Sequence, residues 1–166
     1  MEIWIDGYNL IRQVDHLSDQ ERKGGLETGR TALIRLLSGY RSETGNRIVV
    51  VFDGDDGIEG PDTSSVRGIR IIFSRPPSLA DDLIIAHVRR SHGKKKLLVV
   101  SSDREILREA DRHKISTMKA AAFSIELRSP NLIEEGNSTR EAETEDLGDT
   151  SYWEKVFREE KGMFDE

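Results

Sequence analysis

Three aspartates of this 166-residue chain, Asp6, Asp53 and Asp103, come at or just after apolar runs typical of buried strands. Parallel strands joined by right-handed crossovers end at one edge of a sheet, where open α/β folds bind their ligands. We therefore expect the three carboxylates to share that edge. Each also has a structural explanation: Asp6 and Asp53 precede glycine and suit a turn, and Asp103 suits the cap of a helix.

Asp81 is a fourth candidate, and its helical register directs it toward the same edge. In a helix expected over residues 79–91, Asp81 falls within the apolar stripe that must face the sheet. Its neighbour Asp82 points about 100° away and is included only as a supporting acid. Ser78 and Asp81 also have the spacing of a capping box, which explains why an acid is tolerated there.

Carboxylates gathered at one edge repel one another and raise one another's pKa values unless a cation neutralises them. The chain has no cysteine, and its four histidines fall in no ligand spacing, so the candidate ligands are oxygen atoms. Oxygen ligands favour a hard ion such as Mg²⁺ or Mn²⁺ over Zn²⁺. Such an ion orients a water molecule, lowers its pKa and stabilises charge on phosphoryl oxygens. The pattern therefore predicts phosphate chemistry.

Apolar runs alternate with helical patterns along the chain, which is typical of α/β domains. Strands are expected over residues 3–5, 47–54, 69–73, 97–101 and 115–118. Helices are expected over residues 26–40, 79–91, 103–113 and 120–127. The almost wholly apolar segment 47–54 is the candidate central strand. The residues after Asp6 are expected to form a turn, and residues 54–65 a loop.

The charge of the chain is divided unevenly. The formal net charge is −6, but residues 134–166 carry −8 and residues 1–133 carry +2. We expect one domain over residues 1–130 and an acidic C-terminal tail over residues 131–166, in which residues 151–162 have the pattern of a short helix. The tail is either simply solvated or a screen that competes with nucleic acid for the basic body.

Membrane insertion and secretion are not expected for this chain. No apolar run is long enough to span a bilayer, and the first residues lack the basic and apolar pattern of a signal peptide. The absence of cysteine excludes disulfides and thiolate metal sites. A cytoplasmic location fits these features.

Four segments together resemble a known family: DGYNLI at residues 6–11, VVVFDG at 49–54, LADDLI at 79–84 and VVSSDREI at 99–106. In order and spacing they are similar to the NYN domains of the PIN-like nuclease superfamily, most closely the YacP-like branch, over about residues 1–127. The resemblance implies a PIN-like three-layer α/β/α sandwich with a central, mainly parallel sheet. It also implies an endoribonuclease that uses Mg²⁺ or Mn²⁺ to hydrolyse single-stranded RNA.

The resemblance also implies roles for individual residues. The expected metal ligands and catalytic acids are Asp6, Asp81 and Asp103, with Asp53 as a supporting acid. Asn9 is a supporting residue that could hold a water, a phosphate or the Asp6 carboxylate. Apart from the resemblance, basic residues that flank the edge in sequence are expected to contact RNA, namely Arg12, Arg30, Arg75 and Arg104. A larger ribonucleoprotein is a candidate partner, and the oligomeric state stays open.

Two features depart from the family pattern. Leu79 stands where many members have Thr or Ser, and the chain continues past Pro130 into an acidic segment instead of a basic helix. The second departure leaves the mode of RNA docking open. The basic run Lys94-Lys95-Lys96 is expected at the opposite end of the sheet from Asp81, because a helix separates the two.

Two other functions stay open at this point. A PIN-like module that binds RNA or protein without cutting would show no metal-dependent cleavage. A phosphoacceptor receiver domain also places aspartates at strand ends, and Asp53 and Lys119 imitate its layout. A receiver would have paired acids after its first strand, however, and here Gly7 follows Asp6.

Overall fold

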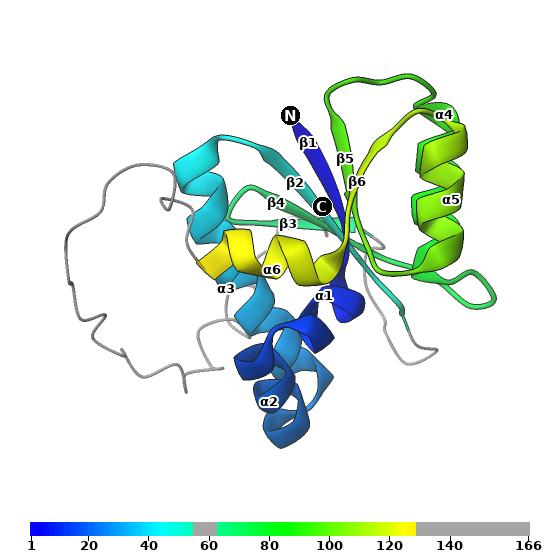
Figure 1. Ribbon diagram of the computed structural model, residues 1–166. Coiled ribbons are helices and arrows are strands. Elements are labelled where there is room, and N and C mark those ends of the chain that lie inside the picture. Colours follow the sequence, from blue (N-terminus) through cyan, green and yellow to red (C-terminus); the bar gives the residue numbers. More distant parts are fainter. Residues whose placement is uncertain (55–62, 129–166) are drawn as a thin grey trace, which may run out of the picture.

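The computed structural model describes residues 1–54 and 63–128, in which helices surround one sheet (Figure 1). The strands are β1 (Glu2–Asp6), β2 (Arg47–Phe52), β3 (Thr63–Val66), β4 (Ile69–Phe73), β5 (Leu97–Val100) and β6 (Ser116–Met118). The helices are α1 (Gly7–Gln13), α2 (Asp15–Gly24), α3 (Leu26–Thr44), α4 (Ala80–Arg90), α5 (Arg104–Arg112) and α6 (Ala120–Arg128). The expected acidic tail, with its helix at 151–162, lies outside the described residues.

The strands pair in the order β3-β4-β2-β1-β5-β6, and every pairing is parallel except that of β3 with β4. Ile5 of β1 lies beside both Val50 of β2 and Val100 of β5. The ends of these three neighbouring strands are therefore level. The predicted mainly parallel sheet is confirmed, and the segment 47–54 supplies a central strand that ends at Phe52.

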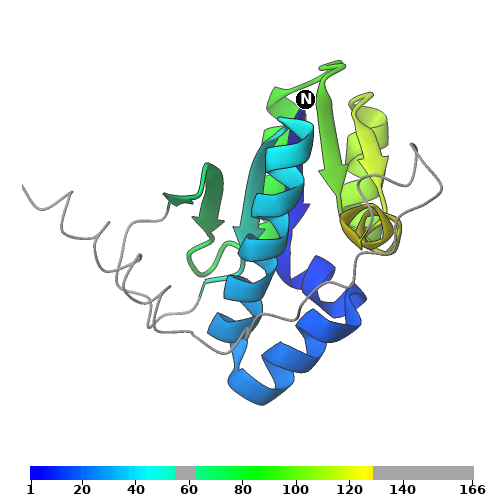
Figure 2. The same cartoon turned by 90° about the vertical axis from the view of Figure 1, so that its left-hand side faces the viewer.

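Each face of the sheet is covered by its own layer of helices. Because side chains alternate along a strand, Ile3 and Ile5 pack with α1, α2, α3 and α6, whereas Trp4 packs with α4 and α5. In Figure 2, which is viewed from the α3 side, α3 lies in front of the sheet. The predicted three-layer sandwich is confirmed. Within the described residues, no helix combines the length and the hydropathy needed to cross a bilayer.

The segment after Asp6 corrects one prediction. The sequence predicts a turn there, but Gly7 begins α1 directly, and the Asp6 side chain caps this helix by accepting the Asn9 backbone N–H. Glycine and asparagine are weak helix formers, which makes the segment look like a turn. Burial of Leu10 and Ile11 against the sheet stabilises the short helix that local propensity does not predict.

A second correction concerns residues 54–65, for which the sequence predicts a loop. Thr63–Val66 form β3, which pairs with β4 through a tight turn at Arg67 and Gly68. Both turn residues have positive φ, 50° and 77°, as two-residue hairpin turns require. The polar Thr-Ser-Ser segment lies at an edge of the sheet and is largely exposed, so it lacks the hydrophobic pattern of a buried strand.

Candidate functional site

The strand order creates a crevice beside β1. Counted along the chain, the parallel strands of the described sheet take the order 3-2-1-4-5, so the order reverses between β1 and β5. In open α/β folds, ligands bind outside the carboxyl ends of the strands at such a reversal. Asp6 ends β1, and Ser101 directly follows β5. The residues expected to do chemistry therefore lie where the topology favours a binding site.

The same strand order contradicts the receiver-like alternative. Receiver domains take the order 2-1-3-4-5, in which the reversal lies elsewhere. In addition, Asp53, the candidate phosphoacceptor, accepts the backbone N–H of Ala80 at 2.7 Å. Asp53 is thus engaged in capping α4, a helix that follows it by more than twenty residues in the chain.

Each strand-end aspartate caps a helix through its Oδ1 atom. The backbone N–H donors are Asn9 for Asp6 at 3.5 Å, Ala80 for Asp53 at 2.7 Å, and Glu105 and Ile106 for Asp103 at 2.9 and 3.1 Å. The cap predicted for Asp103 is therefore confirmed, whereas Asp6 and Asp53, for which the alternative was a turn residue, cap helices instead. Capping does not exclude a second role, because each cap uses one oxygen of the carboxylate and leaves Oδ2 for another partner.

Asp81 does not cap its own helix. The spacing of Ser78 and Asp81 predicts a capping box, but the N-cap residue is Leu79, and its backbone N–H donates to Asp82 at 2.8 Å. The predicted pair is therefore wrong, because the N-cap and the capping acid each lie one residue later in the chain than predicted. Asp82 is exposed, and its carboxylate caps the first turn of α4. Its role in the site is therefore to stabilise the helix that carries Asp81. The half-buried Asp81 carboxylate is left outside the cap.

The aspartates act on one another electrostatically. Burial raises the pKa of Asp6 to about 6, and the negative charge of Asp81 adds to this, with smaller contributions from Asp53 and Asp103. The Asn9 backbone N–H opposes the rise. The pKa of Asp81 is also raised, by burial and then by the charges of Asp103 and Asp53. These four acids are thus near enough to influence one another's ionisation, and Asp6, Asp53 and Asp103 end or follow neighbouring parallel strands.

The residues present fit a divalent cation through their charge and donor type. Among the described residues, no three Asp, Glu or His side chains converge tightly enough to form a preassembled metal centre. Magnesium commonly binds proteins through one or two carboxylates and keeps several waters. Asp6 and Asp81 suit that arrangement, since a cation would offset the burial and the mutual repulsion that raise both pKa values. Asp103 stays a predicted third ligand through its Oδ2.

Two polar residues connect the start of α1 to the β5–α5 loop. The fully buried Ser101 hydroxyl lies 3.5 Å from Asp6 Oδ2 and accepts the Asp103 backbone N–H at 3.0 Å. Asn9 was a candidate ligand for water, phosphate or Asp6, but its side-chain oxygen accepts the Ser102 N–H at 2.9 Å. Ser101 is a site residue that the sequence did not single out. A signal was present, because Ser101 is a polar residue directly after a wholly buried strand.

The four arginines expected to contact RNA occupy different surroundings. Arg30 Nη1 donates to the hydroxyl of the buried Tyr8 at 2.7 Å, so Arg30 supports the packing of α3 against α1. Arg12, Arg75 and Arg104 are exposed. RNA contact stays a prediction for all four, and the inward contact of Arg30 makes it the weakest candidate.

The lysine run lies at the other end of the sheet, as predicted. The Lys96 carbonyl accepts the backbone N–H of Glu2 at 2.8 Å, and Lys94 Nζ lies 3.7 Å from the Glu2 carboxylate. Glu2 begins β1, whereas Asp6 ends it. A strand's length therefore separates these lysines from the candidate site.

Sequence comparison finds similarity over most of the chain. Residues 3–160 match the family described as the YacP-like NYN domain. A curated relative, the uncharacterized protein YacP of Bacillus subtilis (strain 168), is 35% identical over 82 residues. This alignment covers 48% of the chain and 46% of the relative, so the chain matches less than half of that protein's length.

Two crystal structures of Rae1 (YacP) from Bacillus subtilis share the fold. For one, the TM-score is 0.63 and the identity 24%, over 78% of this chain and 74% of the other. For the other, a mutant of the same protein, the TM-score is 0.60 and the identity 24%, over 77% of this chain and 75% of that one. At this level of identity, the likeness shows a shared fold. Any conclusion about the chemistry must come from the residues of the candidate site.

Proposed function

This chain belongs to the family of YacP-like NYN domains, a PIN-like nuclease-type family, and on that premise we propose that it is a metal-dependent endoribonuclease. Its substrate would be single-stranded RNA in the cytoplasm, either free or held in a larger ribonucleoprotein. The observation that carries the proposal is the group of aspartates whose burial and mutual repulsion raise the pKa of Asp6 to about 6. Such repulsion opposes folding, and a bound cation explains why the chain retains it.

Asp6 and Asp81 would hold Mg²⁺ or Mn²⁺, which when bound supplies a polarised water and neutralises charge on the phosphoryl oxygens. The Asn9 backbone N–H and the Ser101 hydroxyl orient the Asp6 carboxylate before any ligand arrives. Asp53 is a positioning residue, because its bond to the Ala80 N–H fixes the start of α4, where Asp81 is the next residue. Asp103 contributes negative charge and its free Oδ2.

The competing function is a module that binds RNA or protein without cutting. It is favoured by the absence of a preassembled three-ligand site in the described part of the chain. Such a module would bind equally well with or without divalent metal. It would also leave the raised pKa of Asp6 without an explanation.

We expect the purified protein to cleave an unstructured, end-labelled RNA only when Mg²⁺ or Mn²⁺ is present. The products should carry 5′-phosphate and 3′-hydroxyl ends, because water would attack the phosphorus in line with the O3′–P bond and O3′ would leave. A duplex of the same sequence and a reaction with EDTA are the controls. RNA that is bound but stays intact at every metal concentration would support the non-catalytic module instead.

A further inference from the structure

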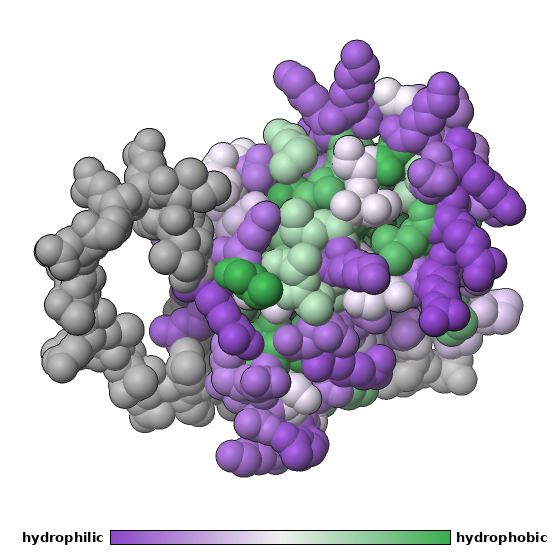
Figure 3. All heavy atoms as spheres, in the orientation of Figure 1, coloured by the Kyte–Doolittle hydropathy of each residue, from purple (hydrophilic) through white to green (hydrophobic). Residues whose placement is uncertain are grey.

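A depression of about 770 Å³ adjoins the candidate site and extends along α5. Asn9 and Asp103 line it at the end nearest the site. The rest is lined by four arginines of α4 and α5, namely Arg89, Arg104, Arg108 and Arg112, and by the acids Glu105 and Glu109. In Figure 3, hydrophilic side chains gather over the side of the molecule where α4 and α5 lie. We refer to this depression as the arginine cleft.

The arginines of α5 form a row that leads away from the candidate site. Arg104, Arg108 and Arg112 are four residues apart, so they share one face of the helix. Each step advances about 6 Å along the helix axis, at 1.5 Å per residue. This is comparable to the spacing of phosphates along a nucleic-acid strand. The row begins directly after Asp103, the residue that caps α5.

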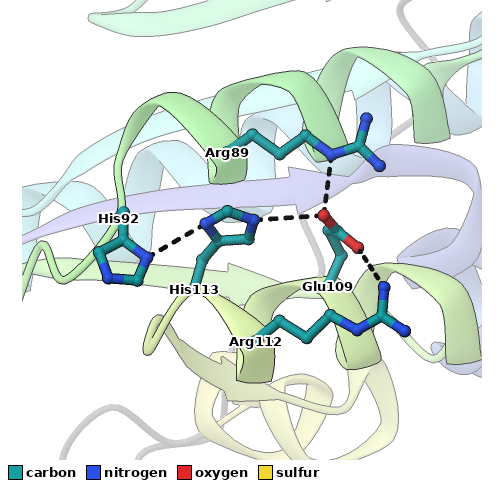
Figure 4. Close-up of polar contacts among 5 residues, drawn as sticks. All are labelled: Arg89, His92, Glu109, Arg112 and His113. Atoms are coloured by element: carbon teal, nitrogen blue, oxygen red, sulfur yellow. Dashed lines mark hydrogen bonds and ion pairs between the residues drawn. The ribbon is translucent and has the colours of Figure 1, made fainter.

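Two arginines of the cleft are held in place by a buried carboxylate. Arg89 Nε donates to Glu109 Oε1 at 2.8 Å, and Arg112 Nη1 lies 3.4 Å from Glu109 Oε2 (Figure 4). Glu109 is only 8% exposed, whereas the side chains of Arg89 and Arg112 are 61% and 74% exposed. A guanidinium has five N–H donors, so one bond to Glu109 leaves others available to solvent or a ligand.

Glu109 keeps its charge in this arrangement. The hydrogen bond from Arg89 lowers the pKa of Glu109, and His113 Nε2 lies 3.2 Å from the same carboxylate oxygen. Neutralisation of a buried carboxylate is therefore a sufficient structural reason for Arg89 and Arg112. It does not account for the other two arginines. Among the described residues, exposed Arg104 and Arg108 form no ion pair, and like charges four residues apart on a helix repel.

We propose that the arginine cleft binds the sugar-phosphate backbone of the RNA strand on one side of the scissile bond. This inference rests on the proposed nuclease function, which places the bond to be cut beside Asp6 and Asp81. Arg104 and Arg108 contact phosphates close to the site, while Arg89 and Arg112 contact phosphates further along α5. The net charge of the whole chain gives no sign of this basic surface, because the acidic residues of the C-terminal segment make that net charge negative.

An acidic protein segment is the competing occupant of the cleft. Arginine is enriched in protein interfaces as well, but there it accompanies aromatic side chains that fill desolvated pockets. The lining of the arginine cleft offers charged and polar side chains, with Asn9 and Ser102 beside the candidate site. This composition suits contacts to a phosphate backbone, which are made by arginines, polar side chains and backbone N–H groups.

The test is the affinity of the full chain for a fluorescent oligouridylate, measured by anisotropy in EDTA over a series of salt concentrations. We expect Arg104→Gln combined with Arg108→Gln to weaken binding roughly 10-fold. Each lost phosphate contact lowers the number of counterions that are released when the RNA binds. The slope of log affinity against log salt should fall in magnitude by about 1.4, at about 0.7 per phosphate on a single strand. Both side chains are exposed and form no ion pair with any other described residue, so the thermal midpoint should stay unchanged.

The matched control combines Arg35→Gln with Arg128→Gln, which removes the same charge from exposed positions on α3 and α6. It should leave the slope close to that of the parent. The inference is wrong if the cleft variant binds like the parent, or if the parent shows no salt-dependent binding. If the parent cleaves RNA but the cleft variant binds RNA as tightly as the parent, the role of the arginine cleft is refuted and the nuclease function is not. Binding through the cleft without any cleavage would refute the nuclease function alone.

Discussion

Asp81→Asn is expected to lower the rate of RNA cleavage roughly 100- to 1,000-fold, because a metal-bound carboxylate supports several kcal/mol of transition-state stabilisation. The substitution keeps the shape of the side chain and removes its charge. Asp81 lies outside the cap of α4, which is made by Asp53 and Asp82. The fold and the affinity for RNA in EDTA should therefore be preserved. Single-turnover cleavage assays with saturating protein measure the effect.

Asp82→Asn is the matched control, since it makes the same chemical change one residue away. The asparagine side chain would still offer an oxygen to the Leu79 N–H, so the loss in stability should be about 1 kcal/mol or less. Cleavage should stay within a few-fold of the parent. If both variants cut RNA as fast as the parent, Asp81 has no part in the chemistry. Equal damage by both would mean that the start of α4, and not the carboxylate, is what matters.

Asp6→Asn is expected to stabilise the protein at about pH 8 in EDTA by up to about 3 kcal/mol. Folding raises the pKa of Asp6 from 3.8 to about 6, so the folded state binds this proton more tightly than the unfolded state. The resulting stabilisation is fully present below about pH 4 and is lost as the pH rises through about 6. Above that pH, the ionised Asp6 is a buried charge beside other acids. Asparagine removes the charge and still caps α1.

Urea denaturation of Asp6→Asn and the parent at about pH 4 and about pH 8 measures this effect. The difference in unfolding free energy should be large at the higher pH and close to zero at the lower one. Asp111→Asn, an exposed position on α5, is the control and should change stability by less than about 0.5 kcal/mol at either pH. A parent that is more stable than Asp6→Asn at about pH 8 would contradict the repulsion assigned to this residue.

The hydrophobic pattern was sufficient to predict most of the sheet. Residues 47–52 and 97–100 are buried along their whole length or nearly so, and their β-branched runs indicate a strand covered on both faces. Asp6 and Asp103 could be placed at one edge because parallel strands end together. These predictions depend only on the chain's local periodicity and on the handedness of crossovers.

Contacts between distant segments could not be predicted in the same way. Asp53 caps α4 across 27 residues of chain, and Ser101 meets Asp6 across 95. The helical spacing of Arg104, Arg108 and Arg112 is visible in the sequence, but the packing of α4 against α5 brings Arg89 to Glu109. The helix α1 was missed for a related reason, since burial and not propensity stabilises it.

The most direct test is a crystal of the protein soaked in Mn²⁺, with anomalous differences measured at the manganese absorption edge. We expect a peak in contact with the carboxylates of Asp6 and Asp81, and its absence from crystals of Asp81→Asn soaked in the same way. Water molecules should complete the coordination, since the protein supplies so few ligands. A map with no manganese at this edge of the sheet, at a concentration that supports cleavage, would contradict the metal site.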